Sequence, residues 1–267
     1  MRCKPLAYAF IALSFLAGCK NAPEASSAST TTTGGGTAAS GGKPTPGALA
    51  DLKTDDLKPG KGKAAAKGDT LWVLYTGTLP NGTKFDSTAD HGNQPFQVEV
   101  GAGQVIKGWD EGLVGMKVGG ERKLSIPWKL AYGEMGNEKI PPKTDLFFDV
   151  TAVALVKQGE EDLVSVESQT PGTGPEVADG DTITIDYTIS LPGGDVADKR
   201  KDVKVIVGKT IAIPGLDSGV VGMKEGGKRR LMIPPKAGIP YGKGKIPAQS
   251  VIYIDVQVKK VQKGKKA

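Results

Sequence analysis

The sequence has very little cysteine and histidine for a chain of 267 residues. Both cysteines, Cys3 and Cys19, lie near the start, so no disulfide framework can support a domain further along. His91 is the only histidine, and without a downstream cysteine it cannot form the usual zinc clusters. The carboxylates are scattered and show no calcium-loop spacing. We therefore expect no metal and no other cofactor.

An excess of charge of one sign is also missing. The 35 lysines and arginines against 29 aspartates and glutamates leave a net charge of +6, or 6 − 2 = +4 if Arg2 and Lys4 are removed with a leader. So mild a charge argues against a nucleic-acid partner. The 38 glycines indicate many turns and little helix.

The start of the chain has the composition of a targeting segment. Arg2 and Lys4 precede a short apolar stretch, Leu6–Leu16, which is followed by small residues and then Cys19. The stretch is too short to cross a bilayer comfortably, which takes about 20 helical residues. The segment resembles a bacterial lipoprotein signal, so we predict that residues 1–18 are removed. The alternatives are an ordinary secretory cleavage site and a permanent transmembrane helix.

Cys19 then becomes the lipidated first residue of an extracytoplasmic protein. Two or more acyl chains anchor a protein stably in a membrane. Because Lys20 follows and not aspartate, the resemblance implies the outer membrane, with the protein facing the periplasm or the cell surface. Residues 19–47 are rich in Ser, Thr, Ala and Gly, including Thr30–Gly36, and predict a flexible tether.

An internal repeat organises the rest of the chain. The segment Val105–Pro127 recurs without a gap as Ala212–Pro234. Matching pairs flank the two copies: Gly68-Asp69 with Gly180-Asp181, Tyr75-Thr76 with Tyr187-Thr188, and Tyr132-Gly133 with Tyr241-Gly242. The repeat unit is a whole domain, far longer than a solenoid module. We predict domains at 48–157 and 158–261, followed by a basic tail at 262–267.

The pattern within each copy is mostly that of strands. Residues 70–79, 96–100 and 146–153 are rich in β-branched and aromatic residues and are bounded by turn formers. One short helix is expected at about Trp109–Met116, with acidic residues in its first turn. An antiparallel sheet needs one covered face, which such a helix can supply. The expected class is α+β, with each domain an antiparallel twisted sheet wrapped on one short helix.

Seven separated motifs of the first copy resemble the FKBP-type peptidyl-prolyl isomerases in order and nearly in spacing. They are Val73–Gly77, Lys84–Ser87, Pro95-Phe96, Val105–Trp109, Ala131–Gly133, Ile140–Pro142 and Phe148–Val150. The resemblance implies two tandem FKBP-like domains and the rotamase activity of an enzyme. The chain departs from the family between Tyr132 and Pro141, where the loop is one residue shorter and Asn137 stands where many members have histidine.

The resemblance also implies an apolar proline pocket with Trp109 as its floor. The implied catalytic residues are Tyr75, Phe85, Asp86, Trp109, Tyr132 and Phe148. The implied substrate-binding residues are Phe96, Val105, Ile106 and Ile140. The N–H of Ile106 and the hydroxyl of Tyr132 would bind ligand carbonyls, with Asp86 near the turning amide. Proline-containing polypeptides and macrolide immunosuppressants are the implied ligands.

Such a reaction requires no nucleophile, general base or metal. Rotation about the Xaa-Pro bond gives up amide resonance, against a barrier of about 18–20 kcal/mol. The planar amide is strongly polar and the half-rotated amide is less so. An apolar cavity therefore penalises the ground state more than the transition state, and this difference is catalysis.

The second copy has lost most of the aromatic set. Ala197 stands at the position of Phe85, Leu216 at that of Trp109, Ile254 at that of Phe148, Ala212 at that of Val105, and Val203 near that of Phe96. Tyr187 and Asp198 are retained. We predict a degenerate second domain with a structural, substrate-holding or partner-binding role.

Two functions follow from these observations. The first is a lipid-tethered proline isomerase that assists the folding of exported proteins. The alternative is a non-catalytic chaperone or scaffold lipoprotein that binds unfolded or partner chains. The contrast between Trp109 and Leu216 favours the enzyme, because a pure binding module gives no reason for one copy alone to keep the whole aromatic set.

Overall fold

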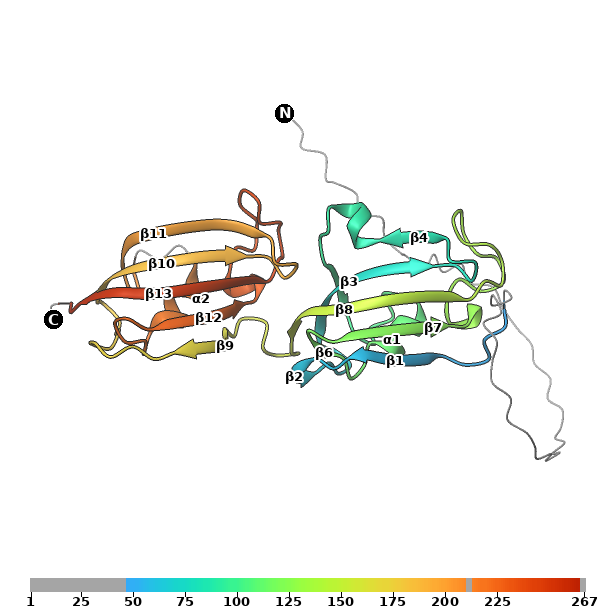
Figure 1. Ribbon diagram of the computed structural model, residues 1–267, viewed down its shortest axis with the longest axis horizontal. Coiled ribbons are helices and arrows are strands. Elements are labelled where there is room, and N and C mark those ends of the chain that lie inside the picture. Colours follow the sequence, from blue (N-terminus) through green and yellow to red (C-terminus); the bar gives the residue numbers. More distant parts are fainter. Residues whose placement is uncertain (1–46, 210–212, 265–267) are drawn as a thin grey trace, which may run out of the picture.

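The computed structural model describes residues 47–209 and 213–264, which form two sheet domains side by side (Figure 1). The predicted signal and Cys19 lie outside the described residues. So do nearly all of the predicted tether, Ala212, and the last three residues of the basic tail.

Repeat one is an antiparallel sheet with short helical segments. Its elements are β1 (Lys53–Lys58), β2 (Lys61–Ala64), β3 (Thr70–Thr78), β4 (Lys84–Ser87), η1 (Thr88–His91), β5 (Phe96–Glu99), α1 (Lys107–Gly112), β6 (Lys117–Val118), β7 (Glu121–Ile126), η2 (Trp128–Leu130) and β8 (Leu146–Val156). The main sheet has the order β1-β7-β8-β3-β4, with β5 also paired to β3. The pair β2-β6 forms a separate small sheet.

Repeat two has the same plan with fewer interruptions. Its elements are β9 (Ser165–Thr170), β10 (Thr182–Ser190), β11 (Val196–Ile206), α2 (Pro214–Val220), β12 (Lys228–Ile233), η3 (Pro235–Ala237) and β13 (Ile252–Gln262). The strand order is β11-β10-β13-β12-β9. The α+β class with two antiparallel domains is therefore confirmed.

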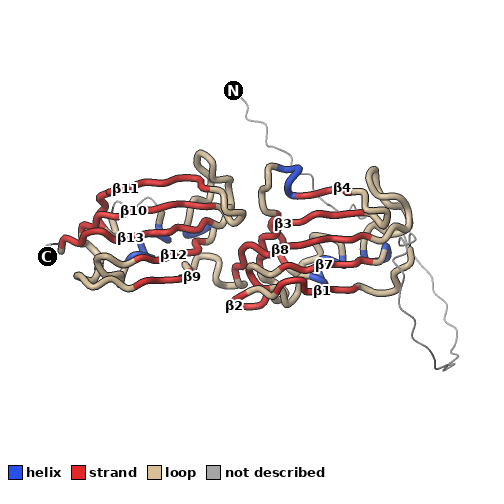
Figure 2. The backbone as a smooth tube through the Cα atoms, viewed as in Figure 1, coloured by secondary structure: helices blue, strands red, loops and turns tan. Residues whose placement is uncertain are grey.

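In each repeat the helix packs closely on the sheet through glycines, and Figure 2 shows these short blue segments behind the strands. A Cβ added to Gly108 would lie 2.3 Å from Ile126 Cγ2, and one added to Gly112 would lie 2.9 Å from Leu124 Cδ2. A Cβ added to the matching Gly219 of α2 would lie 2.4 Å from a methyl carbon of Leu231. Glycine is thus what allows the helix backbone to approach the sheet and close the core.

The helix of repeat one differs from its expected bounds of Trp109–Met116. It begins two residues earlier and ends at Gly112, with Leu113 as the C-cap. The chain then passes through Gly115 at φ 83°, a left-handed conformation that a continuing right-handed helix does not contain. Of the three apolar residues expected to be buried from this helix, Leu113 and Met116 are buried, from the turn and the residue that follows it, whereas Val114 is exposed.

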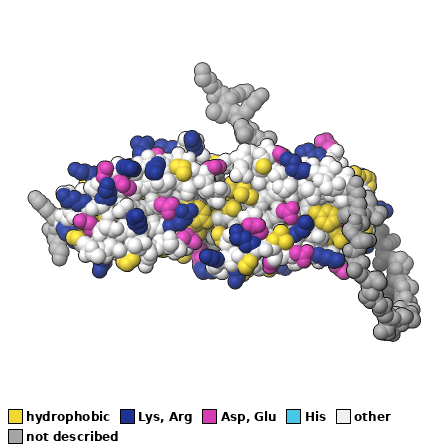
Figure 3. Space-filling model, viewed as in Figure 1, with side chains coloured by type: hydrophobic (Ala, Val, Ile, Leu, Met, Phe, Trp, Pro, Cys, Tyr) yellow, Lys and Arg dark blue, Asp and Glu magenta, His cyan; other side chains and the backbone are white. Residues whose placement is uncertain are grey.

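A small apolar cluster joins the two repeats. It contains Trp72, Ala154 and Val156 of repeat one and Met232, Val251 and Tyr253 of repeat two. The hydroxyl of Tyr253 also donates to the carbonyl of Val153 at 2.9 Å. In Figure 3, hydrophobic side chains gather near the middle of this face, while acidic and basic side chains are interspersed elsewhere. Among the described residues, no helix is long and apolar enough to span a membrane.

Candidate functional site

The sheet of repeat one brings five aromatic side chains together from five elements. Tyr75 comes from β3, Phe85 from β4, Phe96 from β5, Trp109 from α1 and Phe148 from β8. Strand register explains the convergence, since β3 pairs with β4, β5 and β8 along its length. Residues far apart in sequence therefore face the same side of one sheet.

The rings meet mainly edge to face, with Trp109 at the centre. Its indole lies 5.1 Å from the ring of Tyr75, 5.2 Å from Phe148 and 5.9 Å from Phe96, each measured between centroids. Phe85 contacts Phe148 at 5.6 Å and an interplanar angle of 86°. Edge-to-face geometry directs ring hydrogens at ring faces and fixes the aromatic surface firmly.

The cluster has a closed base and a partly open rim. Trp109 is 2% exposed and Phe148 is 1% exposed. Ile106 and Ile140 are also buried, whereas the rim residues Phe85, Phe96, Val105 and Tyr132 are only partly buried. The indole Nε1 of Trp109 is one of two buried side-chain nitrogens in the described part of the chain that have no hydrogen-bond partner.

Gly77 makes this arrangement possible. It pairs with Phe148 on one side of β3 and with Asp86 on the other. A Cβ at Gly77 would lie 2.6 Å from Phe85 Cζ and 2.8 Å from Phe148 Cε1, closer than real Cβ contacts. Glycine thus leaves room for the two phenyl rings over the strand.

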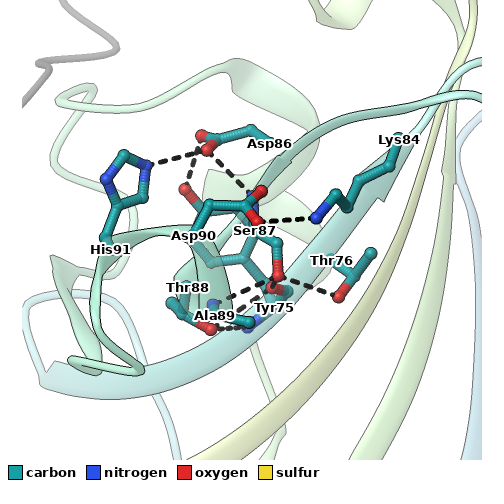
Figure 4. A network of polar contacts seen from close by, with 9 residues as sticks. All are labelled: Tyr75, Thr76, Lys84, Asp86, Ser87, Thr88, Ala89, Asp90 and His91. Atoms are coloured by element: carbon teal, nitrogen blue, oxygen red, sulfur yellow. Dashed lines mark hydrogen bonds and ion pairs between the residues drawn. The ribbon is translucent and has the colours of Figure 1, made fainter.

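Asp86 is the polar group at the edge of the aromatic cluster (Figure 4). Its Oδ2 accepts from the hydroxyl of Tyr75 at 2.7 Å, and its Oδ1 accepts from the Ser87 N–H at 2.9 Å. The Nε2 of His91 lies 3.0 Å from the same Oδ1. Burial acts to raise the pKa of Asp86, but hydrogen bonds from Tyr75, His91 and Ser87 outweigh it and hold the pKa below its ordinary value. The carboxylate is therefore ionised at neutral pH.

The two tyrosines near this carboxylate both stay protonated. Burial, followed by the hydrogen bond to Asp86, raises the pKa of Tyr75 well above the ordinary tyrosine value. Burial, followed by the negative charge of Asp86, raises the pKa of Tyr132 to about 12. Both hydroxyls remain hydrogen-bond donors at physiological pH.

The loop that carries Ile140 is organised by Asn137. The side-chain Oδ1 of Asn137 accepts from the N–H groups of Lys139 and Ile140, each at 2.9 Å, and the Asn137 N–H donates to the Ile140 carbonyl at 2.8 Å. Gly136 adopts φ 65° beside it. The residue that departs from the family pattern therefore has a local structural role, holding Ile140 against the cluster.

In repeat two the same positions are filled by aliphatic residues. Ile189 stands at the position of Gly77 and pairs with Ile254, and both are buried with Leu216 in one core. Ala197 and Val203 pack against that core from β11. The Tyr187 hydroxyl still approaches Asp198, at 3.4 Å.

The structure thus assembles all ten residues that the resemblance indicates in repeat one, nine in a single apolar cluster and Asp86 at its edge. Sequence reasoning missed Gly77 and the contact of His91 with Asp86. The first had a visible signal, since Tyr-Thr is followed by glycine in one copy and isoleucine in the other. No group of three or more His, Cys, Asp or Glu side chains that could hold a metal occurs within the described residues.

Comparison with known proteins agrees with this geometry. The sequence profile described as FKBP-type peptidyl-prolyl cis-trans isomerase matches residues 61–153 and 174–259, more than half of the chain. The chain belongs to this family. It is accordingly a tandem form with two FKBP domains and the rotamase activity that defines the family.

Individual relatives cover one or both repeats. A Neisseria meningitidis protein named FK506-binding protein is 52% identical over 103 residues, which are 38% of this chain and 94% of that protein. Human peptidyl-prolyl cis-trans isomerase FKBP9 is 31% identical over 204 residues, which are 73% of this chain and 35% of that protein. The crystal structure of FkpA from Escherichia coli is 41% identical over 40% of this chain and 49% of that one, with a TM-score of 0.37.

Proposed function

We propose that the aromatic cluster of repeat one is the site at which this chain accelerates Xaa-Pro rotation in exported proteins. The observation that carries the proposal is the arrangement around Trp109: a closed base of edge-to-face rings with a partly exposed rim and one ionised carboxylate at its edge. A proline ring seated on Trp109 would be surrounded by apolar carbon on all sides but the rim.

The chemistry follows from this environment. A planar amide entering the cluster loses water and gains no full set of replacement hydrogen bonds, which costs the polar ground state more than the twisted state. Clamping the ring between Phe85, Phe148 and Trp109 while the preceding carbonyl turns supplies an orientation effect. No bond is broken, so the reaction passes through no covalent intermediate.

The remaining site residues take supporting roles in the proposal. The Ile106 N–H and the Tyr132 hydroxyl bind carbonyls of the peptide beside the proline, while Phe96, Val105 and Ile140 enlarge the apolar wall. The raised pKa of Tyr132, caused first by burial, keeps its hydroxyl available as a donor. Asp86 lies next to the turning amide, where its negative charge favours the loss of negative charge from the carbonyl oxygen as resonance breaks.

The physiological setting is part of the proposal. The leader and the cysteine at position 19 support a lipid-anchored protein outside the cytoplasm, with proline-containing exported chains as substrates. The name of the Neisseria relative supports macrolides of the FK506 type as ligands of the same cluster. Incorporation of labelled palmitate, lost in Cys19→Ser, would test the anchor; equal labelling of both forms would contradict it.

For repeat two we propose a structural or chain-holding role and no second isomerase site. Its core keeps the helix-sheet packing of repeat one but fills the space of the aromatic rings with Ile189, Leu216 and Ile254. Among the described residues of repeat two, these aliphatic side chains occupy the place where a proline ring would enter in repeat one.

The test follows the cis-to-trans relaxation of an Xaa-Pro peptide in the presence of wild type, Phe85→Ala and Asp86→Ala. We expect acceleration by wild type, and a loss of kcat/KM of roughly tenfold or more in both variants, because each removes a group that contacts the turning amide. The matched control is Asp198→Ala in repeat two, which should leave the rate unchanged. No acceleration by wild type would refute the proposal and favour the non-catalytic chaperone.

A further inference from the structure

The single histidine of the chain, His91, lies against the carboxylate of the proposed isomerase site. It is the last residue of η1, and its Nε2 lies 3.0 Å from Oδ1 of Asp86 (Figure 4). The imidazole is about half exposed, while the Asp86 side chain is only 19% exposed. An accessible titratable group therefore contacts the polar group that borders the aromatic cluster.

Of the three donors to Asp86, His91 alone offers an imidazole. The Tyr75 hydroxyl and the Ser87 backbone N–H bind the carboxylate in the same form from acid to mildly alkaline conditions. Imidazole is the side chain that ordinarily gains or loses its charge between pH 5 and 8. A neutral imidazole donates from Nε2 in only one of its two tautomers, whereas the imidazolium always does.

The other charged groups nearby do not replace this contact. Asp90, the residue before His91 on η1, pairs with Lys84 of β4 at 2.6 Å. Across Asp86 lie two neutral phenols, Tyr75 on β3 and Tyr132 after η2. Lys84 is thus engaged by Asp90, and the imidazole of His91 is the basic side chain that contacts Asp86 within the part of the chain that the structure describes.

Repeat two contains the same constellation with a permanent cation. The hydroxyl of Tyr187 lies 3.4 Å from Oδ2 of Asp198, in the same way that the hydroxyl of Tyr75 contacts Oδ2 of Asp86. The Nε of Arg200 lies 3.2 Å from Oδ1 of Asp198. An arginine side chain stays charged at every physiological pH. The two repeats therefore share a tyrosine, an aspartate and a basic donor, but the donor is an imidazole in repeat one and a guanidinium in repeat two.

We propose that His91 is a positioning residue of the isomerase site, and that its protonation fixes Asp86 and raises the isomerisation rate. The proposal rests on the proposed function. The bond from a neutral imidazole to the Asp86 carboxylate joins a neutral donor to an anion, whereas the bond from an imidazolium joins two opposite charges and gains their Coulomb attraction, so the imidazolium confines the carboxylate more tightly between His91 and Tyr75. As pH rises and the imidazole loses its proton, Asp86 gains freedom and kcat/KM falls.

The experiment measures kcat/KM of the full chain between pH 5.5 and 8.0 with an Xaa-Pro peptide that has no ionisable side chain. For wild type we expect a decline of roughly threefold across this range, the size of effect that a weakened orienting contact produces. His91→Arg should be pH-independent at the high rate. His91→Gln should be pH-independent at the low rate.

Two further measurements separate a positioning role from a structural one. Because the chain has one histidine, its imidazole gives one titration curve by NMR, and the midpoint of that curve should coincide with the midpoint of the rate profile. Arg200→Gln, which removes the matching donor in repeat two, should leave the wild-type profile intact. Urea midpoints of all variants establish that each is folded at the pH of assay.

The outcomes are distinct. A wild-type rate that does not change with pH, or a slope that persists in His91→Gln, overturns the role of His91 and leaves the isomerase site standing. A slope whose midpoint differs from that of the imidazole titration also overturns it. Absence of acceleration at every pH overturns the proposed function, and the role of His91 with it.

Discussion

The edge of the sheet differs between the two repeats, and the difference lies beside the proposed site. In repeat two the edge is one strand, β11, which runs along β10 with a bulge near Asp202. In repeat one the edge is broken into β4 and β5 by η1, and this interruption carries Ser87, Thr88 and His91 (Figure 1). The two strands of this interrupted edge contribute Phe85 and Phe96 to the aromatic cluster. A continuous strand covers the same place in repeat two.

The interiors differ in a matching way. Gly77 leaves space over β3 for the rings of Phe85 and Phe148, whereas Ile189 fills that space over β10. The glycines that bring the helix onto the sheet are the same in both repeats. The two repeats therefore share the packing of helix on sheet and differ in the space over the strand, which aromatic rings occupy in repeat one and an aliphatic side chain fills in repeat two.

The largest effect should come from giving repeat one the residue of repeat two at this position. In Gly77→Ile the side chain would occupy the place of Phe85 Cζ, so the proline ring could not reach Trp109. We expect kcat/KM to fall by about 100-fold, as for other misplaced reacting groups. Overpacking should lower the free energy of unfolding by roughly 1–3 kcal/mol. The peptide relaxation assay and a urea titration measure the two effects.

The reverse change in repeat two is the control for Gly77→Ile. Ile189→Gly should lower stability by roughly 2–5 kcal/mol, because it deletes a buried side chain, but it should not change the rate. If Gly77→Ile kept the wild-type kcat/KM, the contrast between open and filled recesses would lose its functional meaning.

The sequence was sufficient for most of this comparison. The repeat, the strands around Tyr75 and Phe148, and the loss of Trp109 in the second copy can all be read from it, because each depends on local pattern or on residue identity. The bounds of the helix could not be read from the sequence, because the burial of Leu113 is compatible with a helix or with a turn. The break of the edge strand by η1 was also missed, because pairing between distant strands decides it and no local propensity does.

The contact between His91 and Asp86 also could not be predicted from the sequence, because the path of the folded chain decides it. They lie five positions apart, and the turn through η1 after β4 brings the imidazole back to the carboxylate. A lone histidine gave a sound argument against zinc but no indication of its partner. The site residues implied by the family resemblance were easier to predict, because the motifs that carry the resemblance contain them.

A second prediction concerns what the repeats share. Asp69 accepts from the N–H groups of Ala66 and Gln158 and pairs with Lys157. Asp181 likewise accepts from the N–H groups of Ala178 and Gly264 and pairs with Lys263. Burial acts to raise the pKa of both carboxyls, but the lysine and the backbone donors hold each pKa below its ordinary value.

Because their pKa values are depressed on folding, these carboxylates stabilise the protein above about pH 4, and this stabilisation is lost as pH falls through the folded pKa. Asp69→Asn and Asp181→Asn should each cost roughly 2 kcal/mol at pH 7. The penalty should be smaller at pH 3, because the unfolded chain takes up protons there and the advantage of the ionised carboxylates in the folded state shrinks. Urea midpoints at the two pH values are the measurement. A large effect at one position and none at the other would show that the two scaffolds are not equivalent.

The smallest effect should come from the junction, where one hydroxyl of repeat two donates a hydrogen bond to repeat one. Tyr253 of β13 stands at the position that Phe147 occupies in β8, and its hydroxyl donates to the Val153 carbonyl of repeat one at 2.9 Å. Tyr253→Phe should lower the free energy of unfolding by about 1 kcal/mol, the net contribution of one hydrogen bond, and should leave the isomerisation rate unchanged.

The control for Tyr253→Phe is Tyr241→Phe, because Tyr241 is 93% exposed and its hydroxyl makes no contact that a folded core requires. Its urea midpoint should equal that of wild type. If Tyr253→Phe also matched wild type, the hydroxyl would not couple the repeats, and the apolar cluster of Trp72, Val156 and Met232 would have to hold the junction alone. If it slowed isomerisation, the site in repeat one would depend on repeat two, and the division between a working and a structural domain would fail.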